Sequence, residues 1–88
     1  MKLIERKEPD WRTVNYFGIE VVLRPHERYV AVDGDGRLHV YTSVPVLMPE
    51  VMETNWSTSG HYRHIGEVDL EGVDWRETLV HFPNEETN

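Results

Sequence analysis

The strongest constraint on the fold of this chain is a stretch of alternating residues that is broken once, at Asp33-Gly34-Asp35-Gly36. Apolar side chains occupy every second position before and after the break, at Val30, Val32, Leu38 and Val40. A period of two on both sides of a Gly/Asp cluster is typical of a β-hairpin. Glycine adopts positive φ at little cost, and aspartate hydrogen-bonds to nearby backbone in turns. The sequence therefore predicts a hairpin over residues 28–42.

Residues 11–23 are predicted to form two short strands or one bent strand. This segment is rich in β-branched and aromatic residues, which favour strands. Asn15 and Gly18 bracket Tyr16-Phe17, where a tight turn would divide the segment. Ile19, Val21 and Leu23 would then share one face.

Residues 61–70 carry the next strand pattern. Val68 and Leu70 alternate with acidic side chains, and Gly66 marks a place for a β-bulge. Asp74 and Glu77 have the spacing of a helix capping box, which predicts one short helical turn.

These patterns predict an α+β fold that is mostly β, with a small antiparallel sheet of about four strands, a central hairpin and one short helical turn near the C-terminus. The chain has 88 residues, enough for a single small domain. We expect a flexible segment at 1–10, one globular domain at 11–82 and a disordered tail at 83–88. The predicted core consists of Val30, Val32, Leu38, Val40, Val68, Leu70, Trp75 and Leu79.

The net charge of −7 lies entirely in the C-terminal half. Residues 49–88 contain nine acidic side chains and only two basic ones, Arg63 and Arg76, whereas the earlier residues are balanced. Direct binding to nucleic acid needs a basic face, so we expect none. An acidic surface is compatible with a basic protein partner. The chain has no cysteine, no secretory signal and no apolar run long enough to span a membrane, which predicts a cytoplasmic protein without membrane contact.

Glu67, Asp69 and Glu71 are the main candidates for a binding site. On an extended strand they would lie in one row, about 6.6 Å apart. That spacing approximates successive phosphates of a nucleic-acid strand. The row, continued by Asp74 and Glu77, suggests the hypothesis of an acidic imitation of DNA. The favoured interpretation is a solvated strand face, or a strand edge that charge protects from aggregation.

Trp56 is the remaining candidate for a partner contact. It stands in a polar segment, where an exposed tryptophan would make a binding hot spot. The alternative is burial in the core, because so small a domain needs its aromatic residues to bury surface.

Catalytic and metal-binding patterns are weak. His61 and His64 lie three apart on a predicted strand and face opposite sides, and no cysteine can complete a zinc site. No serine stands in a nucleophile elbow, and no glycine loop precedes a helix that could hold a phosphate. We therefore expect no catalytic residue, no metal and no cofactor, with a small metal-binding module or enzyme kept as a third alternative.

The order of these motifs resembles a loose group of small, mostly uncharacterised proteins encoded by tailed bacteriophages and prophages. The resemblance depends on Tyr29-Val-Ala-Val-Asp-Gly-Asp-Gly36, Tyr41 and the prolines after it, Trp56, and Asp74-Trp-Arg-Glu-Thr-Leu79. It covers about residues 11–80 and implies an accessory role in host takeover or counter-defence, in the bacterial cytoplasm. None of the shared motifs is catalytic. The leading expectation is a non-enzymatic protein that binds a protein partner, with a homodimer through a strand edge as one form, and a DNA mimic as the alternative.

Overall fold

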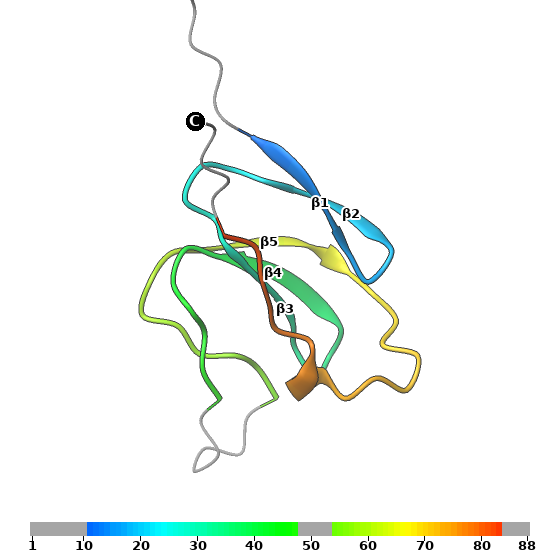
Figure 1. Cartoon of the computed structure of the whole chain (residues 1–88). Coiled ribbons are helices and arrows are strands. Elements are labelled where there is room, and N and C mark those ends of the chain that lie inside the picture. Colours follow the sequence, from blue (N-terminus) through cyan, green and yellow to red (C-terminus); the bar gives the residue numbers. More distant parts are fainter. Residues whose placement is uncertain (1–10, 48–53, 84–88) are drawn as a thin grey trace, which may run out of the picture.

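The computed structural model describes residues 11–47 and 54–83. The predicted flexible start at 1–10 and, apart from Pro83, the predicted tail lie outside these residues. The elements follow the order β1 (Arg12–Tyr16), β2 (Ile19–Leu23), β3 (Tyr29–Val32), β4 (Arg37–Tyr41), β5 (Tyr62–Glu67), the 3₁₀ turn η1 (Trp75–Glu77) and β6 (Val80–His81). They form a two-stranded sheet, β1-β2, and a four-stranded sheet ordered β5-β4-β3-β6, with all pairs antiparallel (Figure 1). This confirms the predicted mostly β fold with one short helical turn.

The first hairpin turns at Phe17 and Gly18, one residue later than the predicted turn at Tyr16-Phe17, because Tyr16 belongs to β1. Both residues have positive φ, 50° and 83°, which is the backbone of a turn that matches the twist of the flanking strands. The side-chain oxygen of Asn15 accepts a hydrogen bond from the Gly18 N–H at 2.8 Å. β1 and β2 then pair from Tyr16 opposite Ile19 to Arg12 opposite Leu23.

The predicted central hairpin joins β3 to β4, with Val30 opposite Val40 and Val32 opposite Leu38. The Asp33 N–H donates to the Arg37 carbonyl at 2.9 Å and closes the turn. Gly36 has a φ of 91°, and a Cβ there would lie 2.6 Å from the Val68 carbonyl oxygen. Only glycine fits this position, since both the backbone angle and the close approach exclude a side chain.

The β1-β2 hairpin covers one face of the four-stranded sheet (Figure 1). The buried cluster between them contains Tyr16, Val21, Leu23, Val30, Val32, Leu38 and Val40, with Val68 and Leu70 packed against it. Each of these aliphatic side chains contributes about 1.5–3 kcal/mol by leaving water. The sequence prediction named the valines and Leu38 of the central hairpin but placed Tyr16 outside its core. The Tyr16 hydroxyl donates to the Thr78 carbonyl at 2.5 Å, which joins β1 to the C-terminal segment.

The opposite face of the sheet carries a second, smaller cluster. It contains Ala31, Tyr41 and Trp56, with Tyr29, Trp75 and Leu79 packed against them. Trp75 and Leu79, expected in one core with the valines, therefore belong to this face. The indole N–H of Trp56 donates to the Val32 carbonyl at 3.1 Å, so the segment after residue 54 is held against the central hairpin.

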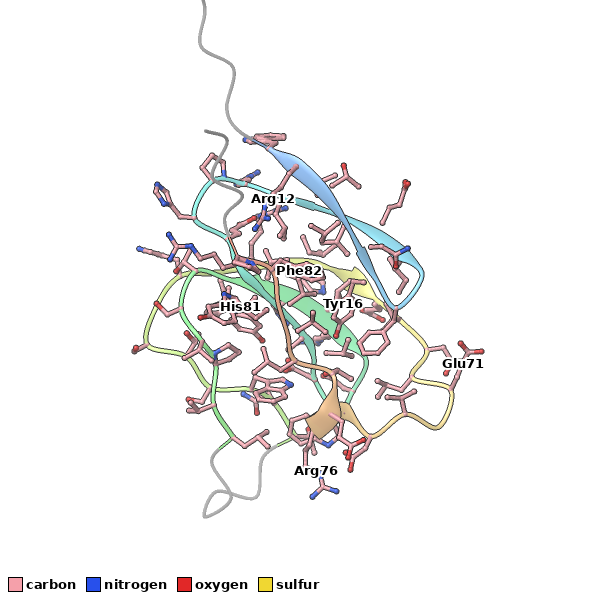
Figure 2. The ribbon with its side chains drawn as sticks, in the orientation of Figure 1. Arg12, Tyr16, Glu71, Arg76, His81 and Phe82 are labelled. Atoms are coloured by element: carbon pink, nitrogen blue, oxygen red, sulfur yellow. The ribbon has the colours of Figure 1, made fainter. Side chains whose placement is uncertain are left out.

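Two arginines hold the β1-β2 hairpin in place. The Arg12 guanidinium donates to the carbonyls of Phe82 and Pro83, at 2.5 and 2.7 Å, and so lies beside the segment that follows β6 (Figure 2). Arg63 on β5 donates to the Val22 carbonyl of β2 at 2.9 Å and to both carboxylate oxygens of Glu27. The two sheets are therefore joined by charged hydrogen bonds as well as by apolar packing.

The strand predicted over 61–70 is shorter than expected, since β5 ends at Glu67. Its pairing with β4 shifts by one residue between Leu38 and His39, which leaves Ile65 as the extra residue beside Gly66. This confirms the predicted bulge. After the strand, the Val68 N–H donates to the Gly36 carbonyl at 2.8 Å, and a turn at Glu71 and Gly72, both with positive φ, reverses the chain.

The predicted helical turn near the C-terminus is confirmed as η1, which is a 3₁₀ turn. The Asp74 carboxylate accepts a hydrogen bond from the Arg76 N–H at 3.0 Å and so caps the turn. Within the described part of the chain, no helix is long and apolar enough to cross a membrane.

Candidate functional site

A row of ring side chains crosses the second face of the four-stranded sheet. The strand register places Tyr62 of β5 opposite Tyr41 of β4, Tyr41 opposite Tyr29 of β3, and Tyr29 opposite His81 of β6. The rings of Tyr29 and His81 stack at 4.6 Å, and those of Tyr41 and Tyr62 lie 6.3 Å apart. Tyr41 is buried, whereas Tyr62 at the sheet edge is 64% exposed. The end of this row at the edge formed by β5 is therefore accessible.

A cavity of about 470 Å³ lies on the same face. One side is lined by His39, Tyr41 and Tyr62, and the turn of the central hairpin contributes its two aspartates. Residues 54–58 line the other side. We name this cavity the Asp33 pocket, because Asp33 is its most buried charged residue.

Asp33 is fixed by contacts from distant parts of the chain. Its Oδ1 accepts a hydrogen bond from the backbone N–H of Trp56 at 3.0 Å, and its Oδ2 lies 3.5 Å from Nδ1 of His39. Only 10% of the Asp33 side chain is exposed. Burial raises the pKa of Asp33, and the Trp56 N–H and the nearby His39 oppose this shift. The site therefore contains a carboxylate that is poorly solvated.

His39 is the second polar group of the Asp33 pocket. Its Nδ1 is buried and has no hydrogen-bond partner, because the approach to Asp33 is too long for a well-formed bond. Burial lowers the pKa of His39, and the Asp33 carboxylate opposes that shift. The ring lies 5.1 Å from the ring of His64 on β5. The neutral imidazole thus predominates at a pH above its usual pKa, and it leaves the charge of Asp33 uncompensated.

Tyr41 has its hydroxyl in the same low-dielectric surroundings. Burial raises its pKa above the usual range, and the nearby Asp33 charge adds to the rise. Tyr41 is therefore a neutral group that offers a ring face and a hydroxyl rather than an acid or base at neutral pH.

The arrangement favours binding over group transfer. An Asp–His pair can orient a histidine as a general base, but a nucleophile must then hydrogen-bond to the ring. Among the described residues, no serine or threonine hydroxyl donates to His39. In the same part of the chain, no three histidine or acidic side chains are grouped closely enough to hold a metal ion.

The outer edge of β5 adjoins the pocket. β5 has six residues and is the longest strand described, and no other described strand pairs with its outer side. The Thr42 N–H donates to the His61 carbonyl at 3.1 Å. Because hydrogen-bonded and non-hydrogen-bonded positions alternate in an antiparallel pair, Tyr62 and His64 direct their backbone groups outward. Their side chains lie on the same face as the pocket, since they pair with Tyr41 and His39.

The three acidic residues predicted to form a row do not share one strand. Glu67 is the last residue of β5, Asp69 lies in the segment after the strand, and Glu71 forms a turn with Gly72. The Asp69 side chain accepts a hydrogen bond from the Glu71 N–H at 2.9 Å, and Glu71 has a φ of 51°. All three side chains are exposed, but the extended geometry with regular spacing was wrong. The chain leaves the sheet here because Val68 and Leu70 turn to pack on the core.

The other predicted site residues are separated from one another. Asp74 caps η1 and pairs with Arg76 at 2.9 Å, at the base of the molecule as drawn in Figure 2. Glu77 is exposed in the same turn. Trp56 is only 8% exposed, so the hypothesis of an exposed anchor was wrong and the alternative of core burial holds. Its ring packs edge-on against Trp75, at 6.1 Å.

Sequence reasoning missed the residues that the Asp33 pocket brings together. Asp33 was assigned only to a turn, and His39, Tyr41 and Tyr62 were not proposed for any site. One signal was present: His39 and Tyr41 alternate with Leu38 and Val40, so both had to face the side opposite the apolar core. Comparisons with protein-family models, with curated proteins and with solved structures gave no match to this chain.

Proposed function

We propose that this chain is a non-enzymatic, phage-encoded accessory protein that binds a protein partner in the bacterial cytoplasm. The observation that carries the proposal is the outer edge of β5, which no strand within residues 11–47 and 54–83 pairs with, and on which Tyr62 is 64% and Ile65 36% exposed. An unpaired strand edge beside a pocket is the arrangement by which many proteins add an extended partner segment to a sheet. The motifs that resemble phage accessory proteins support the origin.

The edge has two parts with different properties. From Tyr62 to His64 the strand pairs regularly with β4 and directs its backbone groups outward. At Ile65 the bulge interrupts the ladder, and bulges discourage further strand pairing. A partner segment would therefore add beside Tyr62–His64, with its neighbouring side chains over the pocket.

The charge of the chain supports a basic partner. Its acidic excess lies in the C-terminal half, which includes β5, and such a surface attracts basic proteins. The DNA-mimic alternative needed a straight acidic row on a strand. Because β5 ends at Glu67 and Glu71 lies in a turn, that alternative has less support than partner binding through the β5 edge.

The test is affinity capture from a bacterial lysate, followed by titration of the purified candidate partner in a calorimeter. The informative variant is His64→Pro, which removes an outward N–H while leaving the ladder to β4 intact. His64→Val is the matched control, since it changes the same side chain and keeps the donor. We expect His64→Val to bind the partner and His64→Pro to lose it.

Equal binding by both variants would refute the role of the edge. Failure of the wild-type chain to retain any protein above a tag-only control would refute the function itself. If light scattering shows a dimer that His64→Pro dissociates, the segment bound at the β5 edge belongs to a second copy of the chain.

A further inference from the structure

Asp33 is a buried carboxylate that lacks a cation. Nine-tenths of its side chain is buried, and Oδ2 accepts no hydrogen bond from any described residue. The one basic ring within 4 Å is His39, whose pKa burial lowers. A carboxylate in such surroundings is stabilised most by a charged donor that arrives in the pocket.

The other charges at the pocket do not meet this need. Arg37 pairs with Asp35 at 3.4 Å, and both side chains are more than half exposed. The pocket is therefore lined by two carboxylates and one guanidinium, together with the neutral imidazole of His39. The pocket retains an excess of negative charge at the position of Asp33.

The walls of the pocket suit a flat cation. Tyr41 and Tyr62 present rings tilted by 35°, with centroids 6.3 Å apart. A guanidinium group stacks on aromatic faces and donates two parallel hydrogen bonds to a carboxylate, whereas an ammonium group is a strongly hydrated point charge. The exposed ring of Tyr62 leaves one side of the pocket accessible next to the outer edge of β5.

We propose that the Asp33 pocket binds the guanidinium group of an arginine side chain carried by the partner segment, with Asp33 as the carboxylate and Tyr62 as the stacking face. This inference rests on the proposed function, because the segment is the one that adds to the β5 edge. Backbone pairing at Tyr62–His64 fixes the segment, and the pocket selects the residue that it carries. Alternate side chains of an added strand enter pockets on one face in this way.

The probe is N-acetyl-arginine methylamide, titrated into the ¹⁵N-labelled full chain and followed by NMR. N-acetyl-citrulline methylamide is the matched control, because it has nearly the same shape without the charge. We expect saturable shifts of the Trp56 backbone and indole signals and of Tyr62 with the arginine probe. Binding of the citrulline probe should be about tenfold weaker.

Two variants locate the site. Asp33→Asn removes the charge but keeps an oxygen that accepts from the Trp56 N–H, so we expect it to fold and to bind the arginine probe about tenfold more weakly. Glu77→Gln removes the same charge from an exposed position on η1 and should bind as the wild type does. Unchanged Trp56 signals in the free Asp33→Asn variant verify that the fold is retained.

The outcomes separate this inference from the proposed function. If His64→Pro no longer captures the partner but still binds the arginine probe normally, the result supports both the arginine site and the proposed function, because the pocket then binds arginine independently of the edge. Equal binding of the two probes, equal binding by Asp33→Asn and Glu77→Gln, or shifts confined to residues outside the pocket would overturn the arginine site. Each of those results leaves the capture experiment at the β5 edge unaffected.

Discussion

The ion pair between Glu27 and Arg63 joins the β1-β2 hairpin to the four-stranded sheet, and its removal gives a quantitative test of the fold. The two carboxylate oxygens of Glu27 accept from the Arg63 guanidinium at 2.8 and 3.0 Å. Oε1 also accepts from the Arg24 N–H at 2.6 Å. The Glu27 side chain is 9% exposed and that of Arg63 is 28% exposed.

The expected cost follows from this burial. Removing one partner of a buried pair leaves an uncompensated charge and costs about 3–5 kcal/mol when both are fully buried. Because Arg63 still reaches solvent, we expect Glu27→Ala to lower the free energy of unfolding by about 2–3 kcal/mol. For a domain of this size, that corresponds to a fall in Tm of about 10–20 °C.

The pH dependence of the same pair has a definite sign. Burial raises the pKa of Glu27, but hydrogen bonds from Arg63 and from the Arg24 N–H outweigh it, and the net pKa lies below the usual 4.5. The unfolded chain therefore binds this proton more readily than the folded chain. The stabilisation is present above about pH 4.5 and is lost as the pH falls through the lower pKa of the folded state.

The assay is a double-mutant cycle with Glu27→Ala, Arg63→Ala and the double variant, measured by urea denaturation. The cycle is needed because Arg63→Ala also removes the bond to the Val22 carbonyl. We expect a coupling energy of about 1.5–3 kcal/mol. The pair of Asp74 and Arg76, at 2.9 Å but on the surface, is the matched control and should show a much smaller coupling.

The reasoning would be refuted by a Glu27–Arg63 coupling no larger than that of the surface pair. It would also be refuted if Glu27→Ala left the acid limb of the stability curve unchanged. Either result would mean that apolar packing alone holds the hairpin on the sheet.

Three further substitutions test single features of the structure. The Val32 N–H donates to Thr78 Oγ1 at 2.9 Å, and Thr78→Val leaves this N–H buried and unpaired. Urea denaturation should therefore show that the free energy of unfolding falls by about 1–3 kcal/mol, and by less for Thr78→Ser. Gly18→Ala places a side chain at a φ of 83° and should lower the free energy of unfolding by about 1 kcal/mol. Gly66→Ala is the control, because the added Cβ meets open space and the φ is not positive, so thermal stability should change little. Equal effects of the two substitutions would contradict the turn geometry. His39 has a lowered pKa because of burial, so stability should decrease as the pH falls below about 6.5. His39→Gln should flatten that slope between pH 7 and 5, and an unchanged slope would show that His39 is not buried as a neutral ring.

The hairpins were predictable because their determinants are local. Positions 30, 32, 38 and 40 alternate with polar or smaller residues, and glycines stand where the backbone needs positive φ. Turn chemistry and period-two burial act over a few residues, so they can be read without knowing what packs on the strand. The same holds for η1, whose cap lies within the motif that predicted it.

The end of β5 was not predictable from the same pattern. Residues 67–71 keep the predicted alternation of exposed and half-buried side chains, yet the backbone leaves the sheet. The Val68 N–H still bonds to the Gly36 carbonyl, but the positive φ of Glu71 and Gly72 then reverses the chain. Alternating burial therefore does not by itself establish a strand, and the acidic row inferred from it was wrong.

By itself, then, the sequence determined the central hairpin, the strand character of residues 11–23, one capped turn and which side of the central strands meets the apolar core. Tertiary structure alone decided that the Asp33 carboxylate is buried, since the Trp56 N–H that donates to it comes from 23 residues further along the chain. It also decided that His39, Tyr41 and Tyr62 share one pocket, because that depends on the register between β4 and β5. Local periodicity assigns a side chain to a face, but only long-range pairing places two such side chains beside each other.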